Sequence, residues 1–445
     1  MRALYARRLA QSLRDQRQFY GHDWTPEQIR QWQLMQFNAQ WQVMCQSVPY
    51  FRRLQQQLKL PPQFAAWRQF QDLMPVMDRK TVQEYRDNLT SHSRPSWQWR
   101  STGGSTAEPL RIPVWKSEAE LASHDLWYGR SWFDITPAHT LFLIWGHSHG
   151  LGRGMRGWGN RCKRRLLDTL RGYYRWSAYD VSTPCLHQAA QALLAVQPTY
   201  LMAYAAFLDR FAQANQYLQP AFHQLGLKVA FATAESFPRA DSAPRIAEVL
   251  GCPVAMEYGA VETGPIAQQR PDGRYLVFWR HYVVEGHASA QIPGTYEILL
   301  TSLFPRCLPL VRYKLGDLMV ARPDTAHFVR EFEAVLGRRH DLIVLPNGGV
   351  IHVEAFTHAV KESPSINGYQ VAQAGNGEIT LCYLADAPLR ASEIAEIRWR
   401  LRHIHAGLPH IRIERVETLV QTRAGKTRRL LYHDASASPV SGSAA

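Results

Sequence analysis

Long hydrophobic runs, closely spaced cysteines and a secretory leader are all missing from this sequence of 445 residues. No apolar run reaches the roughly 18 residues that a membrane-spanning helix needs, so we expect no membrane span. The basic N-terminus lacks the apolar segment of a secretory signal. The six cysteines are far apart, with no CxxC pair and no neighbouring histidine pair, which argues against a zinc site and a disulfide framework. We therefore expect a cytoplasmic protein with reduced thiols.

Acidic residues are the minority among the charged side chains. The chain has 37 Asp and Glu against 51 Lys and Arg, which gives a net charge of +14. This surplus suits anionic partners such as nucleotides, phosphates, an acidic carrier protein, nucleic acid or a membrane surface, and it does not select among them. Hydrophobic residues make up 46% of the chain, so a sizeable packed core is expected and wholesale disorder is not.

The first ninety residues have a helical pattern. Thr25 is a suitable helix cap, with Pro26 in the first turn and Gln28 three residues after the cap. Apolar residues then recur at helical spacing until Pro49 ends the pattern. We therefore predict a helix that packs one face against the core.

Strands and helices alternate after about residue 140. Buried strands are predicted at 140–145, 227–234, 253–258 and 296–303, and helices at 185–196 and 242–250. After Asp341 the pattern starts again, with strands at 378–385 and 411–419 around a helix at 392–404, whose residues Ile394, Ile397, Leu401 and Ile404 share one face. We expect an α/β protein with a large layered α/β N-terminal domain and a small mobile α+β C-terminal domain.

The expected domain limits follow from these patterns. We assign 1–336 to the large domain, with a helical segment at 1–95, and 337–341 to a hinge. The small domain takes 342–433, and the small polar residues of 434–445 are typical of a disordered tail.

The segment GHSHG at 146–150 fits the G-x-S-x-G nucleophile motif of hydrolases, directly after a predicted strand. A nucleophile at Ser148 needs a helix after it, and the next ten residues, LGRGMRGWGN, contain four glycines. We predict no helix there, so a mobile glycine-rich pocket loop is the better interpretation. His147 and His149 lack an indicated third metal ligand.

A second glycine-rich segment, RSTGGSTAEPLR at 100–111, is a candidate phosphate loop. Gly103 and Gly104 allow successive N–H groups to converge on an anion, and Thr102, Ser105 and Thr106 add hydroxyl donors. The GK[ST] ending of the NTPase P-loop is absent. Taken alone, this segment is equally well explained as a turn.

Four further motifs follow in order. They are EYGAVETG at 257–264, RYKLGDL at 312–318, LGRRHD at 336–341 and RAGKTRRL at 423–430. Together with the loop, and with VPYFRR and PVMDRK nearer the N-terminus, they resemble the adenylate-forming superfamily of acyl-CoA synthetases. The phenylacetate–CoA ligase branch, with its capsule-biosynthesis relatives, is the most similar, and the resemblance covers about residues 45–430.

The resemblance implies a role for each matching residue. Residues Thr102, Gly103, Gly104, Ser105 and Thr106 match the loop that holds the β- and γ-phosphates of ATP in the family. Tyr258 and Gly259 match the adenine-stacking motif, and Glu262 its magnesium-binding carboxylate. Further matches imply that Asp317 binds the ribose hydroxyls, that Glu235 lines the nucleotide pocket, that Arg338 belongs to the hinge segment, and that Lys426 is the catalytic lysine carried in by domain closure.

The chain departs from the family pattern at several positions. Ala107 stands where the loop usually has glycine, and His340 replaces the first aspartate of the hinge segment. Ala234 precedes Glu235 where the family has a Gly-Glu pair. The cysteine that follows the adenine motif in metal-binding members is absent, so we predict no structural zinc.

The resemblance implies an AMP-forming acid–thiol ligase that uses ATP, Mg²⁺ and coenzyme A. Attack of a carboxylate on the α-phosphate brings two anions together, so Mg²⁺ at Glu262, the loop N–H groups and Lys426 would supply the neutralising charge. Trp145 and Trp158 make an aromatic or other apolar small-molecule acid plausible. Other interpretations stay open: transfer to an acidic acyl-carrier protein, an amine or a hydroxyl, a serine hydrolase using Ser148, or a non-catalytic nucleotide-binding relative. We do not expect a nucleic-acid partner, and a homodimer is compatible with the sequence.

Overall fold

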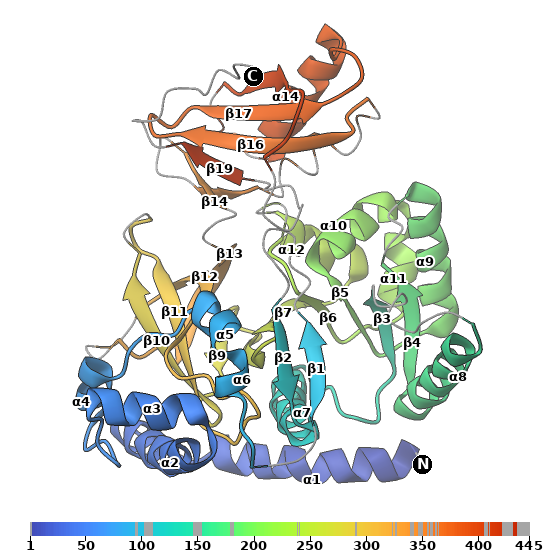
Figure 1. The fold of residues 1–445 in the computed structure, drawn as a ribbon. Helices are drawn as coiled ribbons and strands as arrows, with labels where there is room; N and C mark the ends of the chain where they lie inside the picture. The colour runs from blue at the N-terminus through green and yellow to red at the C-terminus, as the bar shows by residue number, and fades with distance from the viewer. Residues whose placement is uncertain are drawn as a thin grey trace.

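The fold consists of a broad N-terminal body, with a smaller C-terminal unit above it (Figure 1). The computed structural model describes residues 2–93, 97–101, 110–145, 154–178, 182–237, 239, 241–289, 292–322, 324, 327–338, 342–345, 350–353, 356, 359–360, 363, 365–404, 408, 410–420 and 430–433. The predicted α/β architecture is confirmed, with an 11-stranded mixed sheet at its centre. Among the described residues, no helix is long and apolar enough to cross a membrane.

The N-terminal segment is helical, as predicted. Its helices are α1 (Arg2–Tyr20), α2 (Pro26–Ser47), α3 (Pro49–Leu58), α4 (Trp67–Leu73), α5 (Arg79–Glu84) and α6 (Arg86–Leu89). Helix α2 starts with the predicted capping box: the Thr25 hydroxyl accepts from the Gln28 N–H at 3.2 Å, and the Gln28 side chain accepts from the Thr25 N–H at 2.9 Å. Phe37 and Trp41 on α2 are fully buried, so this helix forms part of the core.

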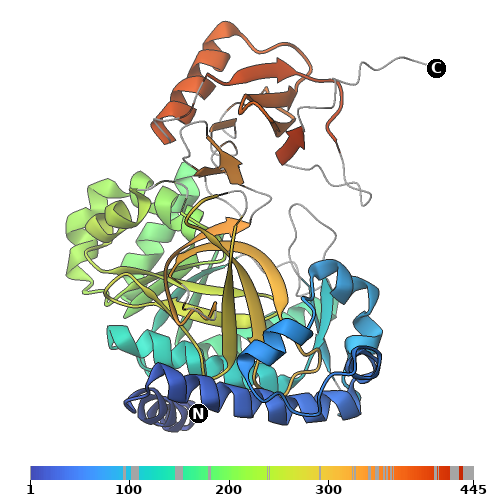
Figure 2. The ribbon, with the colours of Figure 1, turned by 90° about the vertical axis from the view of Figure 1, so that its left-hand side faces the viewer.

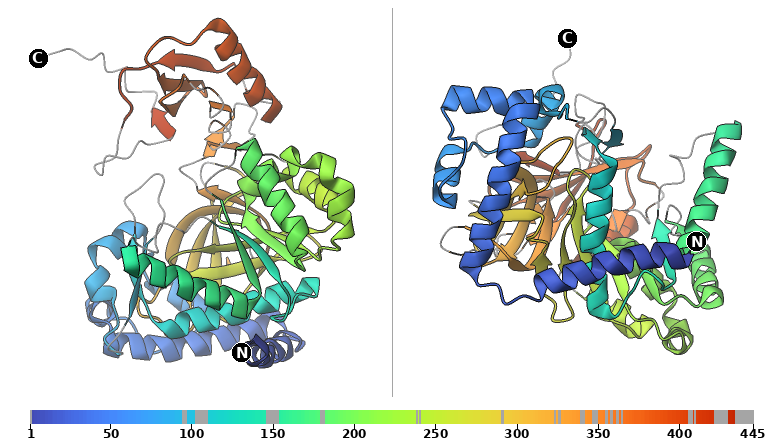
Figure 3. Two further views of the ribbon diagram at one scale, coloured as in Figure 1. Left: turned by 90° about the vertical axis from the view of Figure 1, so that its right-hand side faces the viewer. Right: turned by 90° about the horizontal axis from the view of Figure 1, so that it is seen from below.

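The parallel half of the central sheet carries helices on both faces. Its strands are β3 (Leu141–Trp145), β4 (Tyr173–Ser177), β5 (Tyr200–Tyr204), β6 (Ala230–Thr233) and β7 (Val254–Ala260), in the order β7-β6-β5-β3-β4. One face packs against α9 (Thr183–Val196), α10 (Ala205–Ala214), α11 (Gln219–Gln224) and α12 (Ser242–Leu250). The other face packs against α7 (Lys116–Arg130), which lies above α1 along the base of the molecule (Figures 1 and 3). Short 3-10 turns lie at η1 (Ser131–Phe133) and η3 (Gln216–Leu218).

The other half of the sheet is antiparallel. It comprises β8 (Gly264–Gln269), β9 (Tyr275–Val277), β10 (Tyr282–Ala288), β11 (Tyr296–Ser302), β12 (Tyr313–Ala321) and β13 (Glu331–Arg338). The strand order is β10-β11-β12-β13-β9-β8, and β8 joins the parallel half by pairing with β7. A separate hairpin of β1 (Gln98–Ser101) and β2 (Arg111–Val114) flanks the glycine-rich loop.

The C-terminal unit has a hydrophobic core of its own. It contains β14 (Leu342–Val344), β15 (Val350–His352), β16 (Gly368–Ala374), β17 (Ile379–Leu384), α14 (Ala391–Ile404), β18 (Arg412–Arg415) and β19 (Leu430–His433). Ile397 and Leu401 of α14 are fully buried against β16 and β17, as the predicted helical face requires. Figures 1 and 2 show this unit above the central sheet. The strand β13 includes Gly337 and Arg338, so it extends into the predicted hinge.

One secondary-structure prediction is wrong. Helix α8 (Gly154–Arg171) covers most of the segment in which we predicted no helix. The three glycines within it lie near its first turns, at 154, 157 and 159, where each costs roughly 1 kcal/mol of helix propensity. The following residues, RCKRRLLDTLR, are mostly strong helix formers, and Asp168 binds Arg175 of β4 at 2.6 Å. These contributions outweigh the glycine penalty.

The six cysteines are all free in the structure, and two of them, Cys252 and Cys307, are buried, which is expected to make the free energy of unfolding decrease at alkaline pH. Burial raises the pKa of Cys252 and Cys307 from 9.0 to about 12. Below pH 9 the folded and unfolded thiols are both protonated. As the pH rises from 9 toward 12, the unfolded thiols lose their protons first, so the free energy of unfolding decreases by up to about 1 kcal/mol per pH unit for each thiol.

Urea unfolding at pH 8.5, 9.25 and 10 checks this expectation. The variant Cys252→Ala is expected to show a shallower decrease of unfolding free energy with pH than the parent protein. Equal slopes for the two proteins would show that this buried thiol does not contribute to the pH dependence.

Candidate active site

The carboxyl ends of the parallel strands gather several aromatic and acidic side chains. Trp145 ends β3, Tyr204 ends β5, and Ala234 and Glu235 follow β6. Tyr258 lies near the end of β7. In open α/β sheets, ligands bind outside this edge, and here the edge faces the C-terminal unit (Figure 1). The structure therefore places several predicted site residues on one edge.

Tyr258 and Asp317 meet, although 59 residues separate them in the sequence. The Tyr258 hydroxyl donates a hydrogen bond to Asp317 Oδ2 at 2.8 Å, from β7 to β12. Both side chains are half-buried, and the Tyr258 ring packs edge-on against Phe332 with centroids 6.0 Å apart. Burial, and then the neighbouring Asp317 carboxylate, raises the pKa of Tyr258 well above its ordinary value of 10. The phenol is therefore a stable hydrogen-bond donor that orients the carboxylate.

The turn between β7 and β8 presents Glu262. Thr263 Oγ1 accepts from the Ala260 N–H at 3.1 Å and donates to the Gly264 carbonyl at 2.8 Å, which closes the turn. Glu262 is only 3% exposed, and the Tyr313 hydroxyl donates to its Oε1 at 3.3 Å. Gly259 is required by packing, because a Cβ there would lie 2.4 Å from the Gly264 carbonyl oxygen. The predicted motif thus forms a tight turn with one buried carboxylate.

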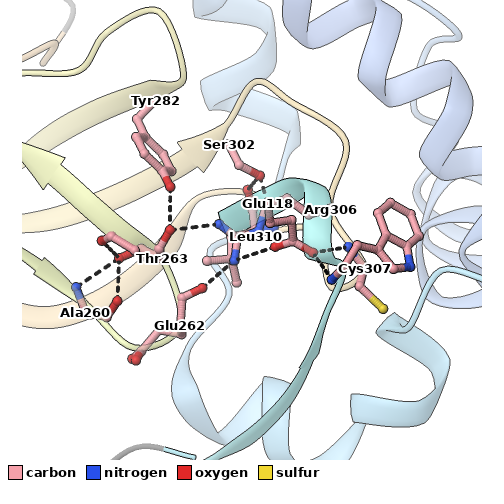
Figure 4. A network of polar contacts seen from close by, with 11 residues as sticks. Glu118, Ala260, Glu262, Thr263, Tyr282, Ser302, Arg306, Cys307 and Leu310 are labelled. Carbon is pink, nitrogen blue, oxygen red and sulfur yellow. Dashed lines mark hydrogen bonds and ion pairs between the residues drawn. The ribbon is translucent and has the colours of Figure 1, made fainter. Parts of the chain in front are cut away.

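Two residues that the sequence did not single out hold this turn. Arg306 donates hydrogen bonds to the backbone carbonyls of Glu262 and Thr263, and the Tyr282 hydroxyl also donates to the Thr263 carbonyl (Figure 4). Arg306 in turn forms a buried ion pair with Glu118 of α7, at 3.4 Å. Single charged residues outside any motif carry no sequence signal for such a contact, which only the fold reveals.

Glu235 has a structural contact in addition to its predicted place in the nucleotide pocket. Its Oε1 accepts from the Ala206 N–H at 2.9 Å, in the first turn of α10. A carboxylate at this position satisfies a free helix N–H and interacts favourably with the helix dipole. Glu235 thus connects the end of β6 to the start of α10.

Ala234, just before Glu235, has φ +71°, a left-handed conformation that costs a residue with a Cβ about 1–2 kcal/mol. This side chain is exposed, so glycine would lose little burial there. Because glycine also has greater freedom in the unfolded chain, we expect Ala234→Gly to raise the free energy of unfolding by only about 0.5–1 kcal/mol.

Chemical denaturation of the parent and the variant measures this change. Gly273→Ala is the matched control, since Gly273 has φ +85° and no atom lies within 4 Å of the position that a Cβ would take. That substitution is expected to destabilise the protein by about 1 kcal/mol. If Ala234→Gly lowers the free energy of unfolding, the backbone of Ala234 is not strained.

Several predicted residues lie outside the part of the chain that the structure describes. These are Thr102, Gly103, Gly104, Ser105, Thr106, Ala107, His147, Ser148, His149, His340 and Lys426. The sequence argument against Ser148 as a nucleophile was that no helix was expected after it. This argument no longer holds, because α8 begins at Gly154. The backbone of Arg338 pairs with Asp317 in the ladder between β13 and β12, which brings the hinge segment beside the predicted ribose ligand.

The described residues on either side of the glycine-rich loop belong to the two strands of one hairpin. Ser101 pairs with Arg111 in the β1–β2 hairpin, so the two ends of the loop are held together. Burial lowers the pKa of Arg100, while the nearby Glu118 raises it and Arg306 lowers it. The base of the loop therefore lies close to the ion pair that supports Glu262.

The donor set of this site fits magnesium better than zinc. Among the described residues, no group of three or more His, Cys, Asp and Glu side chains is arranged to hold a metal ion. Mg²⁺ is commonly bound by one or two carboxylates together with substrate phosphates, and it retains several waters. Glu262 would be one such carboxylate.

Comparisons with known proteins find related ligases and a capsule protein, although no family model matches the chain. Protein CapK of Staphylococcus aureus is 21% identical over 378 residues, which cover 80% of this chain and 78% of CapK. Phenylacetate–coenzyme A ligase of Pseudomonas putida is 22% identical over 254 residues, 52% of this chain and 51% of the ligase. The Aromatoleum evansii ligase is 24% identical over 172 residues, 34% of this chain and 35% of the ligase.

Solved structures show the same architecture. A 2-hydroxyisobutyryl-CoA ligase in its postadenylation state, with a bound acyl-AMP, has a TM-score of 0.62 at 15% identity over 92% of this chain and 90% of that one. The fold is that of the adenylate-forming ligases. The same ligase with acyl-AMP and CoA, in its thioesterification state, gives a TM-score of 0.57 at 15% identity over 92% of this chain and 91% of that one. The resemblance predicted from the motifs is confirmed.

Proposed function

We propose that this chain is an ATP-dependent ligase that converts a carboxylic acid into an acyl-adenylate and transfers the acyl group to the thiol of coenzyme A. The observation that carries this proposal is the hydrogen bond between Tyr258 and Asp317 beside the Glu262 turn. It joins the residues proposed to contact the adenine and the ribose, and Glu262, the proposed metal ligand, follows Tyr258 in the turn after β7. The relatives and the ligase structures with acyl-AMP and CoA support the same chemistry.

In the first step, a carboxylate oxygen of the acid attacks the α-phosphorus of ATP. A bond forms between that oxygen and phosphorus, and the bond to the bridging oxygen breaks, so pyrophosphate leaves. Asp317 would accept hydrogen bonds from the two ribose hydroxyls, with Tyr258 fixing its orientation. Glu262 would hold Mg²⁺, which neutralises phosphate charge when bound.

Lys426 would supply a further positive charge to the reacting phosphate. We propose that 342–433 form a mobile small domain and that 337–341 form its hinge. The backbone of Asp317 pairs with that of Arg338 in the β12–β13 ladder, which supports a hinge close to the proposed nucleotide residues. Closure of such a domain would bring Lys426 to the site and would exclude water from an acyl-adenylate that hydrolyses easily.

In the second step, the CoA sulfur attacks the acyl carbonyl carbon. The carbon–sulfur bond forms, the carbon–oxygen bond of the mixed anhydride breaks, and AMP leaves as the thiol proton is released. The reaction is proposed to take place in the cytoplasm, and an acidic acyl-carrier protein is the second acceptor to test.

The acid is proposed to have an apolar, aromatic body. Trp145 and Tyr204 lie at the ends of neighbouring strands with ring centroids 4.6 Å apart. A flat hydrophobic group packs favourably against such rings. Trp158, which the sequence also indicated, is 65% exposed on α8, so Trp145 carries this part of the proposal.

Product analysis tests the full reaction. Protein, Mg²⁺, ATP and aryl or alkyl acids are incubated with CoA, with carrier protein, or with neither, and AMP and the thioester are quantified. We expect equal amounts of AMP and acyl-CoA, and no product without ATP. If the acyl group is transferred only to the carrier protein, that protein is the acceptor in place of CoA. Hydrolysis of esters without ATP would support the serine hydrolase.

A further inference from the structure

A buried ion pair lies directly behind the Glu262 turn. The Arg306 and Glu118 side chains are only 2% and 4% exposed, and neither belongs to a motif of the family. Burying two charges is expensive unless hydrogen bonds satisfy them. Arg306 uses its guanidinium N–H groups on two consecutive carbonyls, those of Glu262 and Thr263 (Figure 4). The pair therefore fixes the backbone from which the Glu262 carboxylate projects.

Glu118 joins the same turn to the residue that follows the β1–β2 hairpin. Its Oε1 accepts from the Trp115 N–H at 2.8 Å, one residue after β2, and from the Cys307 N–H at 2.9 Å, next to Arg306. Arg100, at the other strand of the hairpin, lies within electrostatic range of Glu118 and Arg306. One carboxylate thus connects the strand that leaves the loop with the segment that holds Glu262.

We propose that Glu118 and Arg306 are positioning residues that hold the metal carboxylate Glu262 at a fixed place relative to the phosphate-binding hairpin. This inference rests on the proposed function and adds how its metal site is organised. The pair touches neither nucleotide nor metal in this scheme. Its role is to keep the β1–β2 hairpin and the Glu262 carboxylate, which would hold Mg²⁺, at a constant separation.

The proposal predicts a specific loss of Mg²⁺ affinity. Mutation of residues that orient a metal ligand typically lowers metal affinity by about 10- to 100-fold. We therefore expect Arg306→Met and Glu118→Gln to raise the Mg²⁺ concentration for half-maximal pyrophosphate exchange by about tenfold or more. Arg306→Lys, which keeps the charge and can reach one carbonyl, is expected to recover part of this loss.

Binding measurements separate this role from general destabilisation. Calorimetry gives the Kd of ATP with and without Mg²⁺, and the Kd of AMP, for each variant. We expect the factor by which Mg²⁺ lowers the Kd of ATP to be about tenfold smaller in the variants than in the parent protein. The Kd of AMP, whose binding is proposed to depend on Tyr258 and Asp317, is expected to change less than threefold. The matched control is Arg175→Met, which breaks the ion pair with Asp168 at 2.6 Å between β4 and α8.

The outcomes distinguish the two proposals. Arg175→Met is expected to lower the melting temperature without changing the metal dependence. If Arg306→Met melts at a lower temperature but keeps the parent response to Mg²⁺ within twofold, the pair is only structural and the positioning role is wrong. If the parent protein neither binds AMP nor exchanges pyrophosphate, the proposed function itself fails.

Discussion

Replacing Lys426 by alanine is expected to lower the rate of ATP–pyrophosphate exchange by about 10²–10³-fold. The attacking carboxylate and the triphosphate are both anions, so negative charge concentrates at the α-phosphate as the new bond forms. Removing one preorganised donor from such a site costs about 10²–10³-fold in kcat. Initial rates at saturating ATP and acid measure the effect.

Two further variants define the cause of this loss. Lys426→Arg keeps the charge with a different shape and is expected to retain more activity than the alanine variant. Arg428→Ala removes a cation from the same segment and is expected to change the rate less than threefold. A Lys426→Ala variant with the parent exchange rate would show that the lysine is assigned wrongly.

Replacing Asp317 by alanine is expected to weaken the binding of both ATP and AMP by about 10- to 100-fold. Hydrogen bonds to a charged group contribute about 1.5–3 kcal/mol, and this carboxylate would accept from both ribose hydroxyls. Because AMP and ATP share the ribose, both should lose affinity to the same extent. Calorimetric titration with each nucleotide measures the change.

Tyr258→Phe is the control for this substitution. It removes the 2.8 Å hydrogen bond to Asp317 and keeps the aromatic ring. We expect a loss of less than tenfold in nucleotide affinity, since Asp317 would remain in place with a less fixed orientation. Unchanged AMP binding by Asp317→Ala would contradict the assignment of this carboxylate to the ribose.

Local patterns in the sequence predicted much of the fold. The capping box at Thr25 and the periodic apolar residues of α2 depend on near neighbours along the chain, and both are present. The buried strands were predicted for the same reason, although β6 begins at Ala230, three residues later than expected. Helix α8 was missed because its glycines dominated a short window, while the strong helix formers came after them.

The site was predictable only where its residues form motifs. Tyr258, Glu262 and Asp317 occur in recognisable segments, and the fold brings them together. Arg306 and Glu118 are 188 positions apart and lie in no motif, so only the packing of α7 beneath the β11–β12 connection reveals their contact. The left-handed backbone of Ala234 likewise contradicts local preference, and only the folded chain shows it.

The measurement that tests the central claim most directly is ATP–pyrophosphate exchange with a panel of aryl, alkyl and hydroxy acids, without CoA. Radioactive pyrophosphate enters ATP only when an acyl-adenylate forms reversibly. We predict Mg²⁺-dependent exchange with at least one acid and no exchange without acid. A folded protein that binds ATP but catalyses no exchange with any acid would contradict this claim.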